Sequence, residues 1–589
     1  MAEPKENVLM EKIVSLCKRR GFVYQSSEIY GGINGFWDYG PLGAELKRNV
    51  KDLWWTSMTR QREDVVGLEA TIIMAPQIWR ASGHVDTFSD PMCDCLLTRK
   101  RFRADQIEPQ SGTAYHYSGA RDTGSGKQSE DAFAVLLPPG KPPESARKTA
   151  IQFYQQRGLA QVELLGERTE KVENSQRFNP DNGALLTEPR PFNLMFKTYV
   201  GPVADEDNVA YLRPETAQAI FAQFKNVLET SRQKVPFGIA QIGKAFRNEV
   251  TPRNFTFRSR EFEQMELEFF IKPDEAIEAI HGSVARPSGP GHPGEPQANW
   301  GWQMWHQYWV EERIRFYESI GLARETLEEY WQKPDELAHY ARATVDLLFK
   351  FPFGTQELEG IAARSDFDLS QHERFSGKQM GVFDEELRGA WAKLDDQRKA
   401  GLSQLYYEAR LKYMLKMGIE KEKAGKEARE DADGLAKGQY IPHVIEPSAG
   451  VDRLILALIA NAYSEVTSTD EKGKAETRVI MKFHPRVAPI KSGVLPLLKN
   501  KPELVAKARE VFELLRKQEQ VFYDEGGAIG RRYARQDEAG TPFCVTIDFE
   551  TLGEKPELLN TVTVRHRDDG RQERVAIAEL PAWLQARVR

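Results

Sequence analysis

The segment at 237–271 constrains the fold more than any other part of the chain, because it predicts a strand, a charged loop and a returning strand. In the returning run EFEQMELEFF, polar and apolar residues alternate. Successive side chains of a strand point to opposite faces of a sheet. One face therefore carries the apolar Met265, Leu267 and Phe269, and the other carries the polar Gln264, Glu266 and Glu268. The segment therefore predicts a β-hairpin with a core on one face and, on the other, a row of polar groups that needs an explanation if it is buried.

The loop between these two strands is crowded with charge. Four arginines lie within fourteen residues: Arg247, Arg253, Arg258 and Arg260. Cross-strand ion pairs with the neighbouring glutamates are the simpler explanation. Arginines on a loop also suit a triphosphate, because guanidinium groups bind phosphate in a forked geometry, and Phe262 among them could stack on a planar base.

Other nucleotide-binding patterns are missing from the sequence. The run GSGKQS at 124–129 lacks the first glycine and the Ser/Thr after Lys127 that a P-loop requires, and it also fails G-x-G-x-x-G. No H-E-x-x-H pattern occurs. A nucleotide site in this chain would therefore use arginines and a sheet.

Length and composition indicate a globular protein of about two to four domains. The chain has 589 residues, of which 40% are hydrophobic and 29% charged. No run approaches the roughly 18 apolar residues of a membrane span, and the N-terminus has no signal-peptide pattern. Four cysteines are too few for a disulfide framework, so we expect a cytoplasmic protein. The CDC run at 93–95 could bind zinc, but buried or surface thiols explain it better.

Changes in composition suggest the domain organisation. Residues 104–190 are irregular, 285–301 are rich in Pro and Gly, and 378–438 are rich in Lys, Glu and Ala and read as helical. A long helix from Pro41 leads to a strand-like run at 65–75. After about residue 476 strands alternate with helices, which predicts an α/β domain. Residues 478–589 hold 20 Lys and Arg against 16 Asp and Glu, which is weak support for RNA contact there.

Three segments resemble the motifs of class II aminoacyl-tRNA synthetases. FRNEVTPRNFTFRSREFEQME resembles motif 2, APQIWRASGH after the long helix resembles motif 1, and EPSAGVDRLILALIANAY resembles motif 3. Within that class, FWDYGPLGAELKRN, YLRPETAQAIF, GIAARSDFDLSQH and AIGRRYARQDEAGTP are similar to the glycyl-tRNA synthetase family. The similarity runs from about residue 8 to 589, broken by the insertions.

The resemblance implies a fold, a reaction and partners. It implies an α+β catalytic domain on an antiparallel sheet at 1–475, with helical insertions at about 104–190 and 285–438, and an α/β anticodon-binding domain at 476–589. Glycine and ATP would form glycyl-adenylate and pyrophosphate, with Mg²⁺, and glycine would pass to the 3′ end of tRNA(Gly). The protein would be a cytoplasmic homodimer without a membrane segment.

The resemblance also implies an ATP site. Arg247 would clamp the α-phosphate, Arg453 would bind the γ-phosphate, and Glu249 would fix the adenine or the ammonium. Glu357 would lie near the phosphates and could hold Mg²⁺. Phe262 would stack on adenine, with Arg258 or Arg260 near the outer phosphates. The remaining members of this set are Asn248, Phe257, Ser259, Glu261, Leu358, Gly450, Val451 and Asp452.

Glycine offers only an ammonium and a carboxylate to bind. Acceptors for the ammonium are implied at Glu215, Glu446 and Ser448, while Arg103 or Arg364 would face the carboxylate or the adenylate. Steric exclusion would reject alanine. The remaining members of this set are Phe262, Glu263, Gln264, Met265, Glu266, Pro447, Ala449 and Gly450. In the C-terminal domain Arg531, Arg532, Tyr533 and Arg535 would contact RNA, unless they form a solvated basic loop.

Two positions depart from the family pattern. Gln106 stands where a histidine is common, and Ala363 where an aspartate is usual. Two alternatives also stay open at this stage. A non-catalytic synthetase-like protein would lack the ATP-binding arginines, which are present here. A class II synthetase for serine, proline or alanine is disfavoured by the acidic EPSAG and RPETAQ segments.

Overall fold

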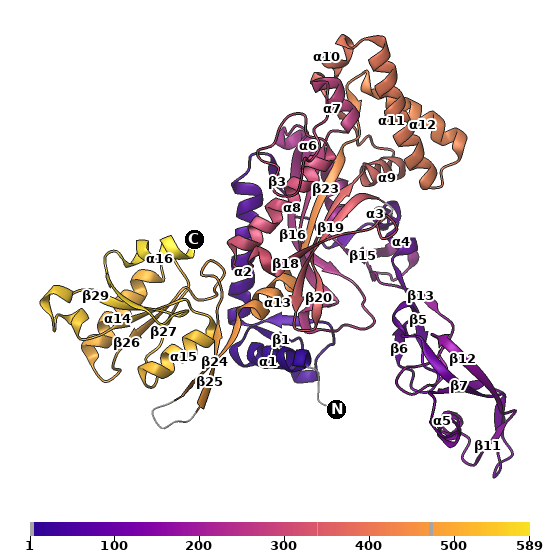
Figure 1. Cartoon of the computed structure of the whole chain (residues 1–589), viewed down its shortest axis with the longest axis horizontal. Coiled ribbons are helices and arrows are strands. Elements are labelled where there is room, and N and C mark those ends of the chain that lie inside the picture. Colours follow the sequence, from indigo (N-terminus) through magenta and orange to yellow (C-terminus); the bar gives the residue numbers. More distant parts are fainter. Residues whose placement is uncertain (1–4, 339, 470–474) are drawn as a thin grey trace. The chain divides into compact units, whose positions relative to one another are not determined.

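The computed structural model describes residues 5–338, 340–469 and 475–589. The chain forms two compact units, and each is described by itself. The first unit contains residues 1–82, 197–246 and 252–589, and the second contains 83–196 and 247–251. The elements are labelled in Figure 1. No helix of the described residues is long and apolar enough to cross a bilayer.

The first unit is built on a seven-stranded sheet. Its strands in order are β18 (Leu327–Trp331), β19 (Ala341–Phe351), β20 (Gly354–Arg364), β23 (His443–Gly450), β17 (Glu261–Ile271), β16 (Phe237–Phe246) and β3 (Val65–Gly67). All neighbours are antiparallel except β3, which runs parallel to β16. The sheet, together with the α/β C-terminal domain, confirms the predicted α+β fold class.

Helices cover one face of this sheet. They are α1 (Lys5–Arg20), α2 (Pro41–Trp55) with its π-helical extension η2 (Thr56–Arg60), α8 (Trp302–Ser319) and α13 (Val451–Ala462). The main hydrophobic core lies between these helices and the sheet. Met265, Leu267 and Phe269 are fully buried in it, as the alternation in the sequence predicts.

The opposite face is covered only in part. Helix α6 (Ala217–Ser231) packs on the end of the sheet that carries Ile239, Phe270 and Val444. The same hydrophobic cluster includes residues of α7 (Asp274–His281), α9 (Phe367–Ser376), α10 (Glu385–Lys393), α11 (Asp396–Lys416) and α12 (Lys421–Leu435). The polar row of β17 lies on this face, beyond the area that α6 covers.

The span 285–438 is not a single insertion. It contributes α8 and three strands of the central sheet, and only its later helices are appended to the core. Pro352 and Phe353 form the turn between β19 and β20. The run at 65–75 forms only β3 and the two-residue strand β4 (Ile73–Met74).

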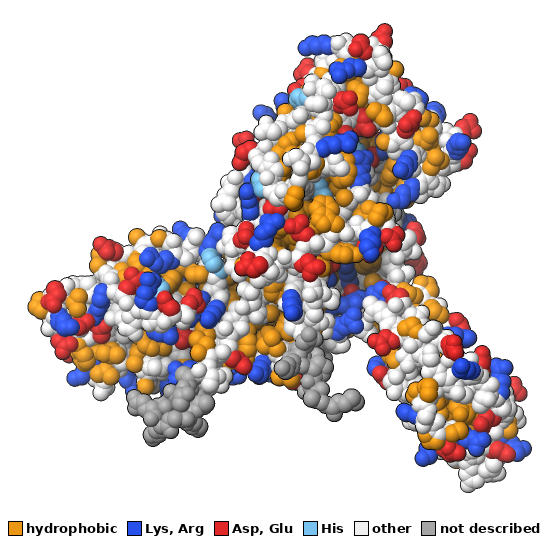
Figure 2. Space-filling view, in the orientation of Figure 1, with side chains coloured by type: hydrophobic (Ala, Val, Ile, Leu, Met, Phe, Trp, Pro, Cys, Tyr) orange, Lys and Arg blue, Asp and Glu red, His pale blue; other side chains and the backbone are white. Residues whose placement is uncertain are grey.

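The C-terminal domain is an α/β structure, as predicted. Its sheet has the order β27 (Val521–Tyr523), β26 (Ser492–Pro496), β28 (Phe543–Ile547), β29 (Thr561–His566) and β30 (Gln572–Ala576). It packs with α14 (Pro502–Leu515), α15 (Ile529–Ala539) and α16 (Leu580–Val588). On the face in view in Figure 2, acidic and basic side chains are intermingled over this domain. Its surface there is not a basic patch.

The second unit has its own core. Its strands include β5 (Ser89–Asp94), β7 (Gln110–Tyr117), β10 (Phe133–Leu137), β12 (Arg168–Ser175) and β13 (Arg190–Asn193), with helix α5 (Glu144–Gln155). Phe133 and Phe153 stack in this core with ring centroids 3.9 Å apart. The unit begins earlier than the predicted insertion at 104–190 and also includes 247–251.

Candidate active site

A polar row crosses four neighbouring strands of the central sheet. The strand registers pair Glu266 with Ser448, Ser448 with Gly360, and Gly360 with Asp346. Paired residues of antiparallel strands share a face, so these four positions line one side of the sheet. This is the face opposite the main core, and it is where the sequence placed a site.

An acid pocket lies at the centre of this row. Glu266 is 2% exposed, and it accepts hydrogen bonds from the hydroxyl groups of Thr216 and Ser448, the latter at 2.7 Å. Gln264 accepts from the Thr216 amide at 3.2 Å and reaches the Ser448 hydroxyl at 3.4 Å. Thr216 directly precedes α6, so the start of that helix closes one side of the pocket.

Arg364 is the one cation in this part of the pocket that the described residues show, and it is already bound by carboxylates. Its Nη1 lies 2.7 Å from Oε2 of Glu446, and its Nη2 lies 2.7 Å from Oδ2 of Asp368. The guanidinium also stacks on Tyr340 at 3.7 Å from the ring centroid. Gln218 donates to both Glu215 and Asp368, which ties Glu215 to the same network. We therefore assign Arg364 to holding Glu446 rather than to binding a substrate carboxylate.

The pocket holds more carboxylates than cations. Oxygens of Glu266, Glu268 and Glu446 lie within 4.8 Å of one another. Burial raises the pKa of Glu446 to about 8, with Arg364 opposing the shift and Glu266 adding to it. Burial and the neighbouring Glu215 raise the pKa of Glu266, and burial and Glu446 raise that of Glu268 well above its ordinary range. Such a cluster favours a bound cation, because a cation would offset the mutual repulsion of the carboxylates.

Three residues of the predicted ATP set lie together beside this pocket: Arg453, Glu357 and Phe257. Nη1 of Arg453, in the first turn of α13, lies 3.3 Å from Oε2 of Glu357 on β20. The Arg453 guanidinium also lies over the ring of Phe257, 4.5 Å from its centroid. Arg453 is partly exposed, so a fork of guanidinium donors is available next to an aromatic face. This suits a nucleotide phosphate beside a base or ribose.

A β-bulge aims Glu357 at this face. The register of β19 and β20 shifts between Leu347 and Leu348, so that Leu348 pairs with Glu357 while Leu347 pairs with Glu359. Leu358, the extra residue, turns into the core and is 1% exposed. Bulges re-aim side chains in this way next to active sites. The side chain of Leu358 therefore does not face the nucleotide group, although it lies beside Glu357 in sequence.

Gly360 leaves open space between two carboxylates. A Cβ at Gly360 would lie 3.6 Å from Oδ1 of Asp346 and 3.6 Å from Oε1 of Glu357. Burial and the neighbouring Glu357 raise the pKa of Asp346, and a hydrogen bond from Gln332 opposes the shift. Paired carboxylates at an open point are donors of the kind that Mg²⁺ prefers. Asp346 was not in the predicted set, because its place depends on strand register.

Several predicted residues point away from this face. Glu263 lies on the opposite side of β17, where Lys47 and Lys51 bind it at 3.0 and 2.8 Å. Asp452 binds Lys47 and the Tyr39 hydroxyl and accepts from the Glu263 amide, so it joins α13 to α2 and β17. Four more residues of the predicted ATP and glycine sets have side chains that face the core: Met265, Pro447, Ala449 and Val451. Alternation along β17 and β23, and the 100° turn per residue of α13, explain these directions.

The residues of the motif 2 loop lie at the start of β17. Arg260 donates from its amide and from Nη1 to the carbonyls of Gly35 and Asn34, and Glu261 is paired with Lys244. Arg258 and Phe262 are half-buried. Ser259, Glu261 and Phe262 line a cavity of about 290 Å³ together with Tyr39, Lys47 and Asp452. The lysines in this cavity are already paired with carboxylates, so it is not a triphosphate site.

Four predicted site residues belong to the second unit. Arg103 binds Asp90 and Asp105 at 3.1 and 2.7 Å. The Arg247 guanidinium lies 5.4 Å from the ring centroid of Phe88. The amide of Asn248 donates to the Leu194 carbonyl at 2.7 Å, and Glu249 is 7% exposed. The hydrogen bond to Asp105 raises the pKa of Arg103, and Asp90 and Glu249 contribute, which places Arg103 and Glu249 in one charged group.

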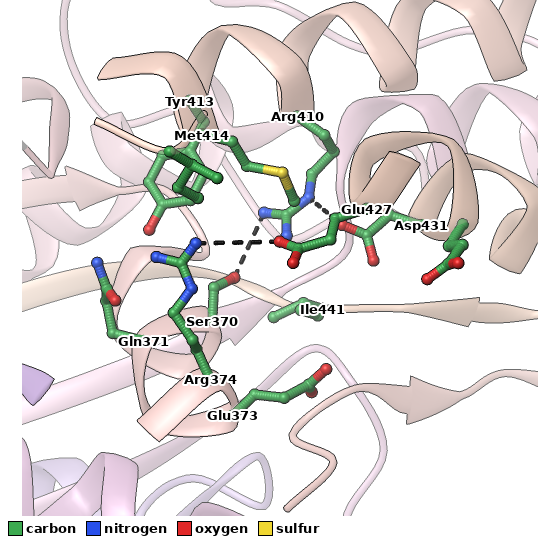
Figure 3. A pocket seen from close by; sticks show the side chains of 12 residues that line it. Ser370, Gln371, Glu373, Arg374, Arg410, Tyr413, Met414, Glu427, Asp431 and Ile441 are labelled. Atoms are coloured by element: carbon green, nitrogen blue, oxygen red, sulfur yellow. Dashed lines mark hydrogen bonds and ion pairs between the residues drawn. The ribbon is translucent and has the colours of Figure 1, made fainter. Parts of the chain in front are cut away.

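Another polar cavity, of about 220 Å³, lies among α9, α11 and α12 (Figure 3). Its arginines are already paired: Arg410 binds Asp431 at 2.7 Å and Ser370 at 3.3 Å, and Arg374 reaches Glu427 at 3.9 Å. These ion pairs join α12 to α9 and α11. The acidic residues that line this cavity are all at least partly exposed, unlike Glu266, Glu268 and Glu446 of the acid pocket.

The predicted RNA-binding residues of the C-terminal domain are mostly structural. The run GRRYARQDEAG forms α15 rather than a loop. Arg532 is 1% exposed and donates to the carbonyls of Pro496 and Leu497, the latter at 3.0 Å. Arg535 binds Asp524 at 2.6 Å, and Tyr533 bonds to Thr546. Arg531 alone of the four is an exposed residue, so it is the member that could contact RNA without rearrangement.

Comparison with known proteins agrees with this fold and site. Residues 196–286 match the family model described as tRNA synthetase class II core domain (G, H, P, S and T), and residues 491–587 match the anticodon binding domain. The chain is therefore built as a class II aminoacyl-tRNA synthetase. It is 42% identical to the glycine–tRNA ligase of Rhodopirellula baltica, covering 98% of this chain and 99% of that protein.

Other relatives extend this similarity. The glycine–tRNA ligases of Thermobifida fusca and Thermus thermophilus are each 42% identical to this chain and cover 98% of it, over 98% and 99% of their own lengths. The chain belongs to the glycine–tRNA ligase family. The resemblance seen in the sequence and the enzyme class it implied are thereby confirmed.

Proposed function

We propose that this glycine–tRNA ligase binds the ammonium of glycine in the acid pocket and ATP beside Arg453. The observation that carries the proposal is the buried surplus of carboxylates around Glu266 and Glu446, on the same sheet face as the Arg453–Glu357 pair. An ammonium is small enough for a closed pocket, and its three N–H donors match acceptors at Glu266, Glu446 and Ser448. Gln264 and Glu215 complete the pocket, and the nearby Gly450 adds no side chain.

In the first step the glycine carboxylate attacks the α-phosphorus of ATP, and pyrophosphate leaves. A carboxylate is already a nucleophile, so no general base is required and the catalysis rests on positioning and electrostatic stabilisation. Arg453 would bind the γ-phosphate with Phe257 beside it. The resemblance alone assigns Arg247 to the charge that develops at the α-phosphate, and it alone assigns the rest of the ATP set, which is Asn248, Glu249, Arg258, Ser259, Arg260, Glu261 and Phe262.

Asp346 and Glu357 are the residues that would hold a Mg²⁺ ion accompanying ATP. Both oxygens flank the open space over Gly360, and hard carboxylate oxygens are the ligands that Mg²⁺ prefers. The ion would reduce the negative charge of the phosphates.

In the second step a ribose hydroxyl at the 3′ end of tRNA(Gly) attacks the glycyl carbonyl, and AMP leaves. Residues 1–475 would carry both steps, and residues 476–589 would bind the anticodon arm. We also propose a cytoplasmic homodimer. All four cysteines are free and buried, which suits a reducing compartment. Light scattering of the purified chain would test the dimer.

The deciding experiment is ATP–pyrophosphate exchange with each amino acid in turn. We expect exchange with glycine alone. Exchange with alanine or serine and none with glycine would refute the assignment of the acid pocket. Exchange with no amino acid would refute the activation step.

A further inference from the structure

Glu268 lies in the deepest part of the acid pocket. It is two residues beyond Glu266 on β17, so both side chains leave the same face of the sheet. The register that pairs Glu266 with Ser448 and Phe269 with Ile445 places Glu268 opposite Glu446 on β23. Residues directly opposite on antiparallel strands have Cβ atoms about 5 Å apart, and like charges at such positions repel.

Glu268 has no hydrogen-bond partner of its own among the described residues. The residue is 0% exposed, and neither of its carboxylate oxygens is satisfied. β16 offers only Ile239 opposite it. The charged groups that act on it are Glu446, Arg364, Glu266 and Asp368, and Glu215 acts in turn on Glu266 and Glu446.

These groups cannot all be charged in the empty pocket. Arg364 is the only cation among them, and its hydrogen bonds go to Glu446 and Asp368. An ionised Glu268 would lie beside Glu446 with no donor to satisfy it, and desolvation and repulsion both favour the neutral acid.

We propose that Glu268 is a positioning residue that carries a proton in the empty pocket, and that this proton is released to solvent when a substrate ammonium binds beside Glu266 and Glu446. The inference rests on the proposed assignment of the pocket to the amino group of glycine. The ammonium brings the positive charge that the proton supplied, so the three carboxylates can ionise together. Binding of glycine is then coupled to release of about one proton per chain.

The direction of the coupling follows from the pKa shifts. Burial raises the pKa of Glu446 to about 8 and that of Glu268 well above its ordinary range, and the two unsatisfied oxygens of Glu268 favour its neutral form in the empty pocket. A bound ammonium lowers these pKa values again, because a nearby opposite charge favours the ionised form. At pH 7 the protons therefore leave on binding.

The test is a proton count by isothermal titration calorimetry. 5′-O-(glycylsulfamoyl)adenosine is titrated into the full-length protein at pH 7, in buffers of different ionisation enthalpy. We expect Glu268→Gln to release about one proton fewer per chain than the wild type. The amide cannot titrate, so the proton that Glu268 gives up is missing from the count, whereas a proton released by Glu446 remains in it. Glu311→Gln removes a buried glutamate that is paired with Arg324 outside the pocket, and it should release as many protons as the wild type.

Each outcome decides the matter. No proton release by the wild type, or undiminished release by a folded Glu268→Gln variant, overturns the inference while leaving the proposed function intact. If Glu268→Gln does not fold, Glu268→Asp replaces it, and this variant should release a proton because it keeps a titratable acid. An analogue that does not bind the wild type at all would overturn the proposed function, and this inference with it.

Discussion

Replacing Glu446 by glutamine is the most direct test of the acid pocket. The substitution keeps the size of the side chain and removes its charge. Glu446 Oε2 accepts from Nη1 of Arg364 at 2.7 Å, and burial raises the pKa of the carboxyl to about 8. The variant therefore removes a carboxylate whose ionised form is disfavoured until a cation binds.

The expected loss follows from one charge-assisted hydrogen bond to the ammonium. Such bonds contribute about 1.5–3 kcal/mol, so KM for glycine should rise by roughly 10- to 150-fold. KM for ATP should change little, because Arg453 and Glu357 are untouched. The folded-state pKa of Glu446 is raised, so the ionised form that binds ammonium becomes available as pH rises toward 8. In the wild type KM for glycine should therefore fall over this range, and in Glu446→Gln the fall should be much smaller.

The same shift predicts an effect on stability. A carboxyl whose pKa rises from 4.5 to about 8 on folding favours the neutral form in the fold, by at most about 5 kcal/mol. The substrate-free wild type should then lose stability as pH rises from about 4.5 to 8, and the glutamine variant should lose less.

Pyrophosphate exchange measured against glycine concentration from pH 6 to 9 checks the prediction on KM. Denaturant unfolding from about pH 4.5 to 8 checks the prediction on stability. Glu311→Gln serves as the control, because it removes a buried glutamate from α8 outside the pocket. A rise in KM of less than threefold, or an unchanged pH profile, would refute the assignment of Glu446 to the ammonium.

Three further changes test other parts of the site. Arg453→Lys keeps the charge but loses the planar fork and the stacking on Phe257, so KM for ATP should rise by roughly 10-fold in the exchange assay while KM for glycine stays within twofold. Gly360→Ala places a methyl group at ordinary contact distance from the carboxylates of Asp346 and Glu357. The free energy of unfolding should therefore change by no more than about 0.5 kcal/mol. The Mg²⁺ concentration for half-maximal exchange should rise. Arg532→Ala leaves buried carbonyls unsatisfied and should destabilise the C-terminal domain by about 1–3 kcal/mol in denaturant unfolding, whereas Arg531→Ala should change only KM for tRNA.

Alternation predicted which face of β17 carries the polar row, but not which groups of other strands lie beside that row. The period of two in EFEQMELEFF separates Gln264, Glu266 and Glu268 from the core residues, and the structure confirms this separation. The same rule, applied strictly, would have removed Glu263 and Met265 from the glycine set. The resemblance that placed them in the set covers a contiguous segment, and a contiguous segment includes residues from both faces of a strand.

Residues that strand pairing brings to the site from distant parts of the chain could not be predicted from their spacing in the sequence. Asp346 is 102 residues before Ser448 in the chain, yet both lie in one row because β19, β20 and β23 pair in a particular register. The bulge between β19 and β20 decides that Glu357 faces the site and Leu358 the core. Asp368 could have been found, because it follows Arg364 by four residues and an acid at that spacing often pairs with an arginine.

Arg532 and Arg364 show that a sequence also does not predict whether a charged side chain is available to a ligand. Both are arginines in segments that resemble substrate-binding motifs, and both are buried with their Nη groups bound by the protein's own oxygens. A sequence gives the charge of a side chain, but whether that charge serves a ligand depends on how many opposite charges the fold places around it. In the acid pocket the carboxylates outnumber the arginine, and around Arg532 backbone carbonyls accept hydrogen bonds from Nη1 and Nη2. Among the described residues, the acid pocket is therefore a place where the fold leaves a surplus of buried carboxylates, and we propose that the substrate ammonium balances it.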